Sequence, residues 1–140
     1  RFDEKFDYYI DIDQALYTTL VPKMIFQPLL ENYFKHGFDY SKIVGRLNIV
    51  CKVLNDQQFQ IVIEDNGKGI LVEKLNMLQS MIEKDNGFER IEGESIGLKN
   101  VYQRLKLYYG NRASMRIYNL QDSGFGIELI IPIDFERVFH

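Results

Sequence analysis

One stretch of the chain carries polar side chains whose types and spacing suit a metal–triphosphate. Residues 23–37 have the apolar periodicity of a helix, and Asn32, Lys35 and His36 stand at i, i+3 and i+4, which are neighbours on a helix surface. The amide oxygen of Asn32 can be a ligand for Mg²⁺, and the ammonium of Lys35 can pair with a phosphate. A solvent-facing helix explains the same residues, because Glu31 and Lys35 form an i,i+4 ion pair and His36 can cap the last carbonyls. Both interpretations stay open for this segment.

A second candidate is the carboxylate of Asp65, which directly follows an apolar strand and precedes Gly67 and Gly69. A carboxylate can accept a hydrogen bond from the exocyclic amine of adenine, whereas guanine presents a carbonyl there. The two glycines let the backbone approach a ring closely, where a Cβ would collide. The alternative is a hairpin turn, since Asp-Asn-Gly is a strong turn signal. Against that alternative, the residues from Leu71 onward have the pattern of a helix.

The third candidate is the stretch from Ser95 to Leu98, where another helix is expected to begin. A helix N-terminus has free N–H groups and the positive end of the dipole, so it can hold a phosphate. Alternatively, Ser95 or Gly97 simply caps the helix. The residues before it, 85–96, show no clear period and could be either a lid over a ligand or a surface loop.

Length and composition indicate one globular domain over residues 1–140. Hydrophobic residues make up 46% of the chain, and the net charge of −3 provides no global attraction for nucleic acid or an anionic membrane. The single cysteine, Cys51, cannot form an internal disulfide, which fits a reducing compartment. No apolar run reaches the roughly 18–20 residues of a membrane span. Because the chain begins at Arg1, we expect it to be part of a longer protein.

The elements that must position these residues can be predicted from periodicity and turn signals. Strands are expected at Phe6–Ile12, Arg46–Val53, Gln58–Glu64, Met115–Leu120 and Gly126–Ile133, and helices at 23–37, Leu71–Lys84 and Leu98–Tyr109. Antiparallel hairpins with helices inserted between them predict an α+β two-layer sandwich, a mixed and mostly antiparallel sheet covered on one face by helices.

Together these segments resemble a known family. Pro22 to Asn32, followed by His36-Gly37, closely follows the asparagine box P-x-x-x-x-Q-P-L-V-E-N…H-G of LytS/YesM-type sensor histidine kinases, and Ile96 to Val101 resembles the last glycine box of that group. The wider resemblance is to the Bergerat-type ATP-binding fold shared by gyrase B, MutL repair proteins and histidine kinases. It spans nearly the whole chain.

The resemblance implies a set of site residues. Asn32 would hold Mg²⁺, Asp65 would accept from the adenine amine, and Glu31 would assist proton removal as the catalytic candidate. The implied ATP-binding residues are Asn32, Lys35, His36, Asp65, Gly67, Lys68, Gly69, Ile70, Ser95, Gly97 and Leu98. Two positions depart from the family pattern: Ser95 stands where another glycine is common, and Tyr33 where a small residue is usual.

The resemblance also implies partners. The phosphorylated histidine of the family lies in a separate helical domain, within a P-H-F-L-F-N motif, and the histidines of this chain, His36 and His140, are not in that context. The chain is therefore expected to be the catalytic, ATP-binding half of a two-component sensor kinase. Its partners would be its own phosphoacceptor and dimerisation helices and a response regulator. The parent would be a membrane-bound homodimer with this domain in the cytoplasm.

Two other functions fit the same fold. Ser95, Tyr33 and the missing acceptor favour a non-catalytic module that senses nucleotide or binds partners through a change of shape. An ATPase or a protein serine kinase is the other alternative. ATPases of this fold place a glutamate one helical turn before the metal-binding asparagine, and Pro28 occupies that position here, which argues against direct hydrolysis.

Overall fold

The computed structural model describes residues 6–14, 45–84 and 96–133. The predicted helix at 23–37 lies outside these residues, and so do Glu31, Asn32, Lys35, His36 and Ser95. The described elements are, in chain order, β1 (Phe6–Ile12), β2 (Gly45–Asn55), β3 (Gln58–Asp65), α2 (Val72–Lys84), α3 (Ile96–Tyr109), the short 3₁₀ helix η6 (Gly110–Arg112), β4 (Ser114–Asn119) and β5 (Phe125–Pro132).

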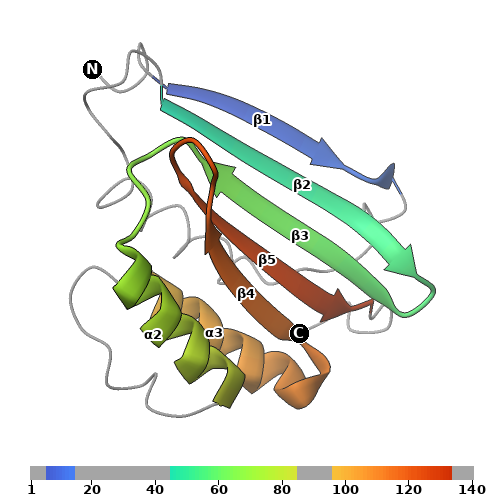
Figure 1. Cartoon of the computed structure of the whole chain (residues 1–140). Helices are drawn as coiled ribbons and strands as arrows, with labels where there is room; N and C mark the ends of the chain where they lie inside the picture. The colour runs from blue at the N-terminus through green and yellow to red at the C-terminus, as the bar shows by residue number, and fades with distance from the viewer. Residues whose placement is uncertain (1–5, 15–44, 85–95, 134–140) are drawn as a thin grey trace.

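The strands of the described residues form one five-stranded sheet with the order β1-β2-β3-β5-β4 (Figure 1). β1 pairs with β2 in parallel, and the other neighbours pair in the antiparallel direction. β2–β3 and β4–β5 are hairpins, and β5 lies between β3 and β4 although both helices separate it from β3 in the sequence. The sheet is therefore mixed and mostly antiparallel, as predicted.

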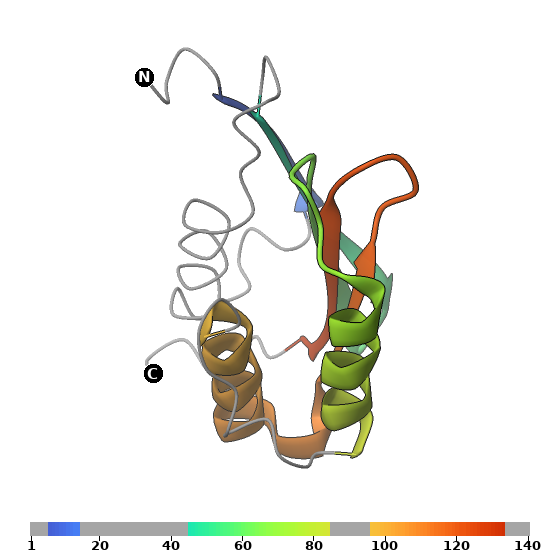
Figure 2. The ribbon, with the colours of Figure 1, turned by 60° about the vertical axis from the view of Figure 1, so that its left-hand side comes forward.

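The helices lie on one face of this sheet (Figure 2). Along β3, buried and half-buried residues alternate strictly, with Phe59, Ile61 and Ile63 directed toward the helical layer. Leu78 of α2 and Val101 of α3 pack against this face and are fully buried. A sheet with one apolar face is stabilised by such a layer, because the apolar side chains of both elements leave water together. The predicted α+β two-layer sandwich is confirmed.

Several element boundaries differ from the prediction by one or two residues, and β4 and β5 each lie one residue earlier than predicted. β3 extends by one residue to Asp65, because the ladder with β2 continues to the pair Leu47–Asp65. α3 begins at Ile96, so Ile96 belongs to a helix and not to the irregular stretch predicted for 85–96. β2 continues to Asn55 past an irregularity in the register. The described residues contain no helix that is both long and apolar enough to cross a bilayer.

The buried thiol of Cys51 gives the stability of this fold a dependence on alkaline pH. Burial, with a further contribution from the charge of Asp11, raises the pKa of Cys51 from 9.0 to about 11. The thiol of Cys51 therefore ionises near pH 9 in the unfolded chain and only near pH 11 in the folded chain. The free energy of unfolding should fall through this window by up to about 2–3 kcal/mol, whereas below pH 9 the thiol contributes no pH dependence.

Urea denaturation of the 140-residue chain and its Cys51→Val variant between pH 8 and 11 measures this effect. Other groups titrate in the same range and affect both proteins equally, so the difference between the two curves isolates Cys51. We expect a constant difference between the two curves below pH 9, and above it an extra loss of up to about 2–3 kcal/mol in the wild-type chain only. Parallel curves up to pH 11 would contradict a raised pKa at this position.

Candidate functional site

Asp65 ends β3 with its side chain on the face covered by the helices. It continues the inward row of Phe59, Ile61 and Ile63, and it is 8% exposed, the one buried charged or polar residue among those described. Its Oδ1 accepts hydrogen bonds from the backbone N–H of Gly67, at 2.7 Å, and of Phe125, at 3.3 Å. Burying a carboxylate is unfavourable unless hydrogen-bond donors replace the water that it loses. The two backbone N–H groups provide this replacement, and they also fix the orientation of the carboxylate.

The loop that follows Asp65 is held against β2 at its first residue. The backbone N–H of Arg46 donates to Oδ1 of Asn66, at 2.7 Å, and the N–H of Asn66 donates to the carbonyl of Arg46, at 3.2 Å. Asn66 thus continues the β2–β3 ladder by one step beyond the strand. Further along the loop, Lys68 is exposed to solvent, whereas Ile70 is half-buried and packs against the core.

Asn119, the last residue of β4, holds the far end of this loop. Its Oδ1 accepts from the N–H of Ile70, at 2.9 Å, and its Nδ2 donates to the carbonyl of Ile70, at 2.6 Å. One amide side chain thus satisfies both polar backbone groups of Ile70, as a neighbouring strand would do. The preceding Gly69 has φ +75°, and a Cβ there would lie 2.8 Å from Oδ1 of Asn119. A glycine at position 69 is therefore required by its backbone conformation and by this contact.

The turn between β4 and β5 closes over the same loop. The hydroxyl of Ser123 donates to the carbonyl of Gly67, at 2.5 Å, and the N–H of Leu120 donates to the carbonyl of Gly124, at 3.0 Å. Gly124 has φ +132°, and a Cβ there would lie 2.0 Å from the carbonyl oxygen of Asp65. Only glycine allows the two backbones to approach so closely.

The described residues include one part of the predicted site. Asp65 at the end of β3 is followed by the predicted site residues Gly67, Lys68, Gly69 and Ile70, and we call residues 65–70 the Asp65 loop. Gly97 and Leu98 lie in the first turn of α3, where the side chain of Leu98 is 1% exposed within the core. Any contact of Leu98 with a phosphate would therefore use its backbone. The predicted Mg²⁺ ligand is outside the described residues, which contain no cluster of three or more acidic, histidine or cysteine side chains suited to a metal.

The sequence analysis missed the residues that hold the Asp65 loop from β4 and β5. Asn119, Ser123, Gly124 and Phe125 all contact it, although the sequence indicated only a connection between the strands predicted at Met115–Leu120 and Gly126–Ile133. The available signal was a polar, glycine-containing turn between two apolar strands, which is common to most hairpins. Nothing in that pattern indicates which other loop the turn contacts.

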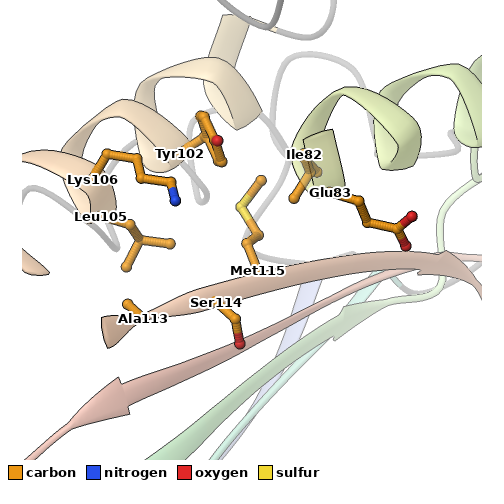
Figure 3. A pocket seen from close by; sticks show the side chains of 8 residues that line it. All are labelled: Ile82, Glu83, Tyr102, Leu105, Lys106, Ala113, Ser114 and Met115. Atoms are coloured by element: carbon orange, nitrogen blue, oxygen red, sulfur yellow. The ribbon is translucent and has the colours of Figure 1, made fainter. Parts of the chain in front are cut away.

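A separate cavity of about 220 Å³ lies between the C-terminal halves of α2 and α3 and the start of β4 (Figure 3). Its floor is apolar, and Glu83 and Lys106 lie at its opposite sides. The lining residues are Ile82, Glu83, Tyr102, Leu105, Lys106, Ala113, Ser114 and Met115. None of them is a predicted site residue, and the Asp65 loop enters α2 at its other end. This cavity is therefore distinct from the candidate site.

Comparison with known proteins places the chain in a family. Residues 20–134 match the family described as histidine kinase-, DNA gyrase B- and HSP90-like ATPases. YwpD of Bacillus subtilis strain 168 is 34% identical over 133 residues, which cover 95% of this chain and 44% of that protein. The sensor protein LytS of Enterococcus faecalis is 27% identical over 138 residues, 99% of this chain and 22% of LytS. The chain thus spans less than half the length of these relatives.

Solved structures show the same fold. The mycobacterial sensor histidine kinase MprB superposes with a TM-score of 0.62 at 17% identity, covering 91% of this chain and 84% of that one. At this level of identity the agreement concerns the arrangement of strands and helices, and it is independent support for the α+β sandwich described above.

Proposed function

Because the chain belongs to the family of histidine kinase-, DNA gyrase B- and HSP90-like ATPases, we propose that residues 1–140 form the catalytic, ATP-binding domain of a two-component sensor histidine kinase. Similarity to LytS along 99% of the chain supports the sensor-kinase assignment. The observation that carries the nucleotide site is the buried carboxylate of Asp65, oriented by two backbone donors at the end of β3.

The Asp65 carboxylate suits adenine for a chemical reason. Each carboxylate oxygen has two lone pairs, so a carboxylate whose Oδ1 accepts from Gly67 and Phe125 can also accept from a ligand amine through Oδ2. Adenine carries such an amine, and guanine carries a carbonyl oxygen at the corresponding position. In a buried site the unmatched pairing of carboxylate with carbonyl is costly, because no water compensates for it. The site should therefore discriminate ATP from GTP.

The phosphates would be held by residues on both sides of the Asp65 loop. We assign Lys35 and His36 to phosphate contacts, together with backbone groups at Ser95, Gly97 and the first turn of α3, whose N-terminal N–H groups favour anions. The amide oxygen of Asn32 has the chemistry of a Mg²⁺ ligand. A bound Mg²⁺ would neutralise charge on the phosphates of ATP.

In the proposed reaction a nitrogen of an acceptor histidine attacks the γ-phosphorus of ATP, and ADP leaves. The acceptor belongs to a helical domain outside this chain, so the chain by itself is expected to be inactive in transfer. Glu31 would assist removal of the imidazole proton. The domain mainly positions the two reactants and neutralises charge, which suits phosphoryl transfer through a loose transition state.

The proposed partners follow from this reaction. They are the phosphoacceptor and dimerisation helices of the parent protein and a response regulator that receives the phosphate. The parent would be a homodimer in the bacterial membrane, with this domain on the cytoplasmic side. The net charge of −3 provides no attraction for nucleic acid.

Calorimetric titration of the 140-residue chain with ATP and with GTP, each with and without Mg²⁺, tests the nucleotide site. We expect binding of ATP that is strengthened by Mg²⁺, and affinity for GTP at least tenfold lower, because one mismatched buried hydrogen bond costs about 1.4 kcal/mol or more. Equal affinities for the two nucleotides would contradict the role of Asp65.

The transfer step needs a second measurement. The chain is mixed with a separately produced acceptor domain of a LytS-type kinase and γ-labelled ATP, and an acceptor whose histidine is replaced by glutamine serves as the control. Acid-labile label on the histidine-containing acceptor alone supports the kinase. ATP binding without any transfer would instead support a non-catalytic nucleotide-sensing module.

A further inference from the structure

On the sheet face opposite the helices, one hydrogen bond spans three strands. The hydroxyl of Tyr118 on β4 donates to Oε2 of Glu64 on β3, at 2.6 Å. The register aligns Glu64, Gly126 and Tyr118 in one row across β3, β5 and β4, which lie side by side in Figure 1. The tyrosine side chain therefore passes over the backbone of β5 to reach its partner.

Gly126 makes this path possible. A Cβ at position 126 would lie 2.3 Å from Cε2 of Tyr118 and 2.4 Å from its Cζ, closer than any packed side chain allows. The φ of Gly126 is not in the left-handed region, so its backbone conformation does not require glycine. The space it leaves is occupied by the ring of Tyr118.

Each member of this row is adjacent in sequence to a residue that contacts the Asp65 loop or belongs to it. Glu64 precedes Asp65, Tyr118 precedes Asn119, and Gly126 follows Phe125, whose N–H donates to Asp65. Successive residues of a strand point to opposite faces. The Tyr118–Glu64 bond therefore lies at the same end of the sheet as the groups that orient the carboxylate and hold Ile70, but on the opposite face.

The bond is suited to fix this end of the sheet. Both partners are partly buried, and a hydroxyl that donates to a carboxylate makes a short, charge-assisted hydrogen bond. Burial of the phenol and its bond to Glu64 raise the pKa of Tyr118 above its ordinary value of 10.0, so the hydroxyl stays a donor beyond the pH at which a free phenol ionises. The guanidinium of Arg116 lies 4.7 Å from the ring centroid and restricts the ring further.

We infer that Tyr118, acting through its hydrogen bond to Glu64 across Gly126, is a positioning residue that holds the strand ends carrying Asp65 and Asn119 at the separation that nucleotide binding requires. This inference rests on the proposed function. It assigns a role in the nucleotide site to a side chain on the other face of the sheet, with no contact to the ligand.

The test compares Tyr118→Phe with Gln60→Leu in the 140-residue chain. Gln60→Leu removes another partly buried hydrogen bond to a carboxylate on the same face, from Nε2 of Gln60 to Oε2 of Glu128 and also 2.6 Å long, but at the other end of β3. Amide hydrogen exchange without nucleotide is measured first, at Gly67 and Ile70. Tyr118→Phe should speed exchange of these two amides by about fivefold to tenfold, and Gln60→Leu should not.

ATP affinity is measured second. Tyr118→Phe should weaken ATP binding by about fivefold, whereas Gln60→Leu leaves it unchanged. Glu64→Leu, which removes the same bond from its other partner, should match Tyr118→Phe. Glu64→Gln keeps an acceptor oxygen for the hydroxyl and should retain most of the affinity of the wild-type chain.

The outcomes separate this inference from the proposed function. If Tyr118→Phe lowers the unfolding midpoint as Gln60→Leu does but changes neither the two amides nor ATP affinity, its role is only structural and the inference is wrong. If the wild-type chain does not bind ATP, the proposed function fails. The exchange rates at Gly67 and Ile70 then still decide whether Tyr118 positions the Asp65 loop.

Discussion

Replacing Asp65 by asparagine should lower the affinity of the chain for ATP by about 10–150-fold, the equivalent of a charged hydrogen bond of about 1.5–3 kcal/mol. The structure explains why this loss should be specific. An asparagine keeps one oxygen that can accept from the N–H groups of Gly67 and Phe125, which now bind Oδ1. Its NH₂ group then replaces Oδ2 and directs a donor at the donor amine of adenine.

Calorimetry with ATP and Mg²⁺ measures the affinity, and urea denaturation checks the fold. Asp122→Asn is a matched control, because it removes the same charge from an exposed position in the turn between β4 and β5. We expect normal ATP binding in Asp122→Asn and a change in unfolding free energy below about 1 kcal/mol in both variants. Normal ATP affinity in Asp65→Asn would exclude this carboxylate as the adenine acceptor.

The second large effect is expected from Gly124→Ala. At φ +132° an alanine is strained, and its Cβ would lie 2.0 Å from the carbonyl oxygen of Asp65. The two penalties together should lower the free energy of unfolding by about 3 kcal/mol or more. Because the clash displaces the end of β3, nucleotide binding should be lost along with stability.

Gly110→Ala separates strain from collision. Gly110 also has a positive φ, +60°, but a Cβ there would meet nothing within 4 Å. This variant should lose only about 1 kcal/mol from its backbone conformation and should bind ATP normally. Urea denaturation of both variants gives the comparison. A loss in Gly124→Ala no larger than in Gly110→Ala would show that the two backbones separate easily, and that Asp65 is not held rigidly.

The secondary structure of the described residues could largely be predicted from local patterns. The alternation in Gln58–Glu64 and the apolar stripe of Leu98–Tyr109 indicate a strand and a helix because side chains repeat every 2 and about 3.6 residues in these elements. Errors occur at the ends, where a non-local partner decides. β3 includes Asp65 because Leu47 of β2 pairs with it, and spacing within the strand does not contain that information.

The candidate site also combines features that local sequence indicates with contacts that depend on non-local partners. The carboxylate and glycines of the Asp65 loop were identified from residue type and order, since an acceptor followed by residues without a Cβ is a local feature. The contacts that orient the loop are non-local. Asn119 is 49 positions from Ile70, and Tyr118 is 54 positions from Glu64. They meet only because β5 inserts between β3 and β4.

The amino-acid sequence alone thus determined which groups are candidates for nucleotide chemistry, because that depends on the functional groups themselves and on their neighbours along the chain. The tertiary structure decided that Asp65 is buried and oriented, that Asn119 and Gly124 hold its loop, and that Gly126 lets Tyr118 reach Glu64. The physical reason is that strand order and register arise from burial of apolar faces contributed by the whole domain. Only after that burial do polar groups far apart in the sequence come within hydrogen-bonding distance.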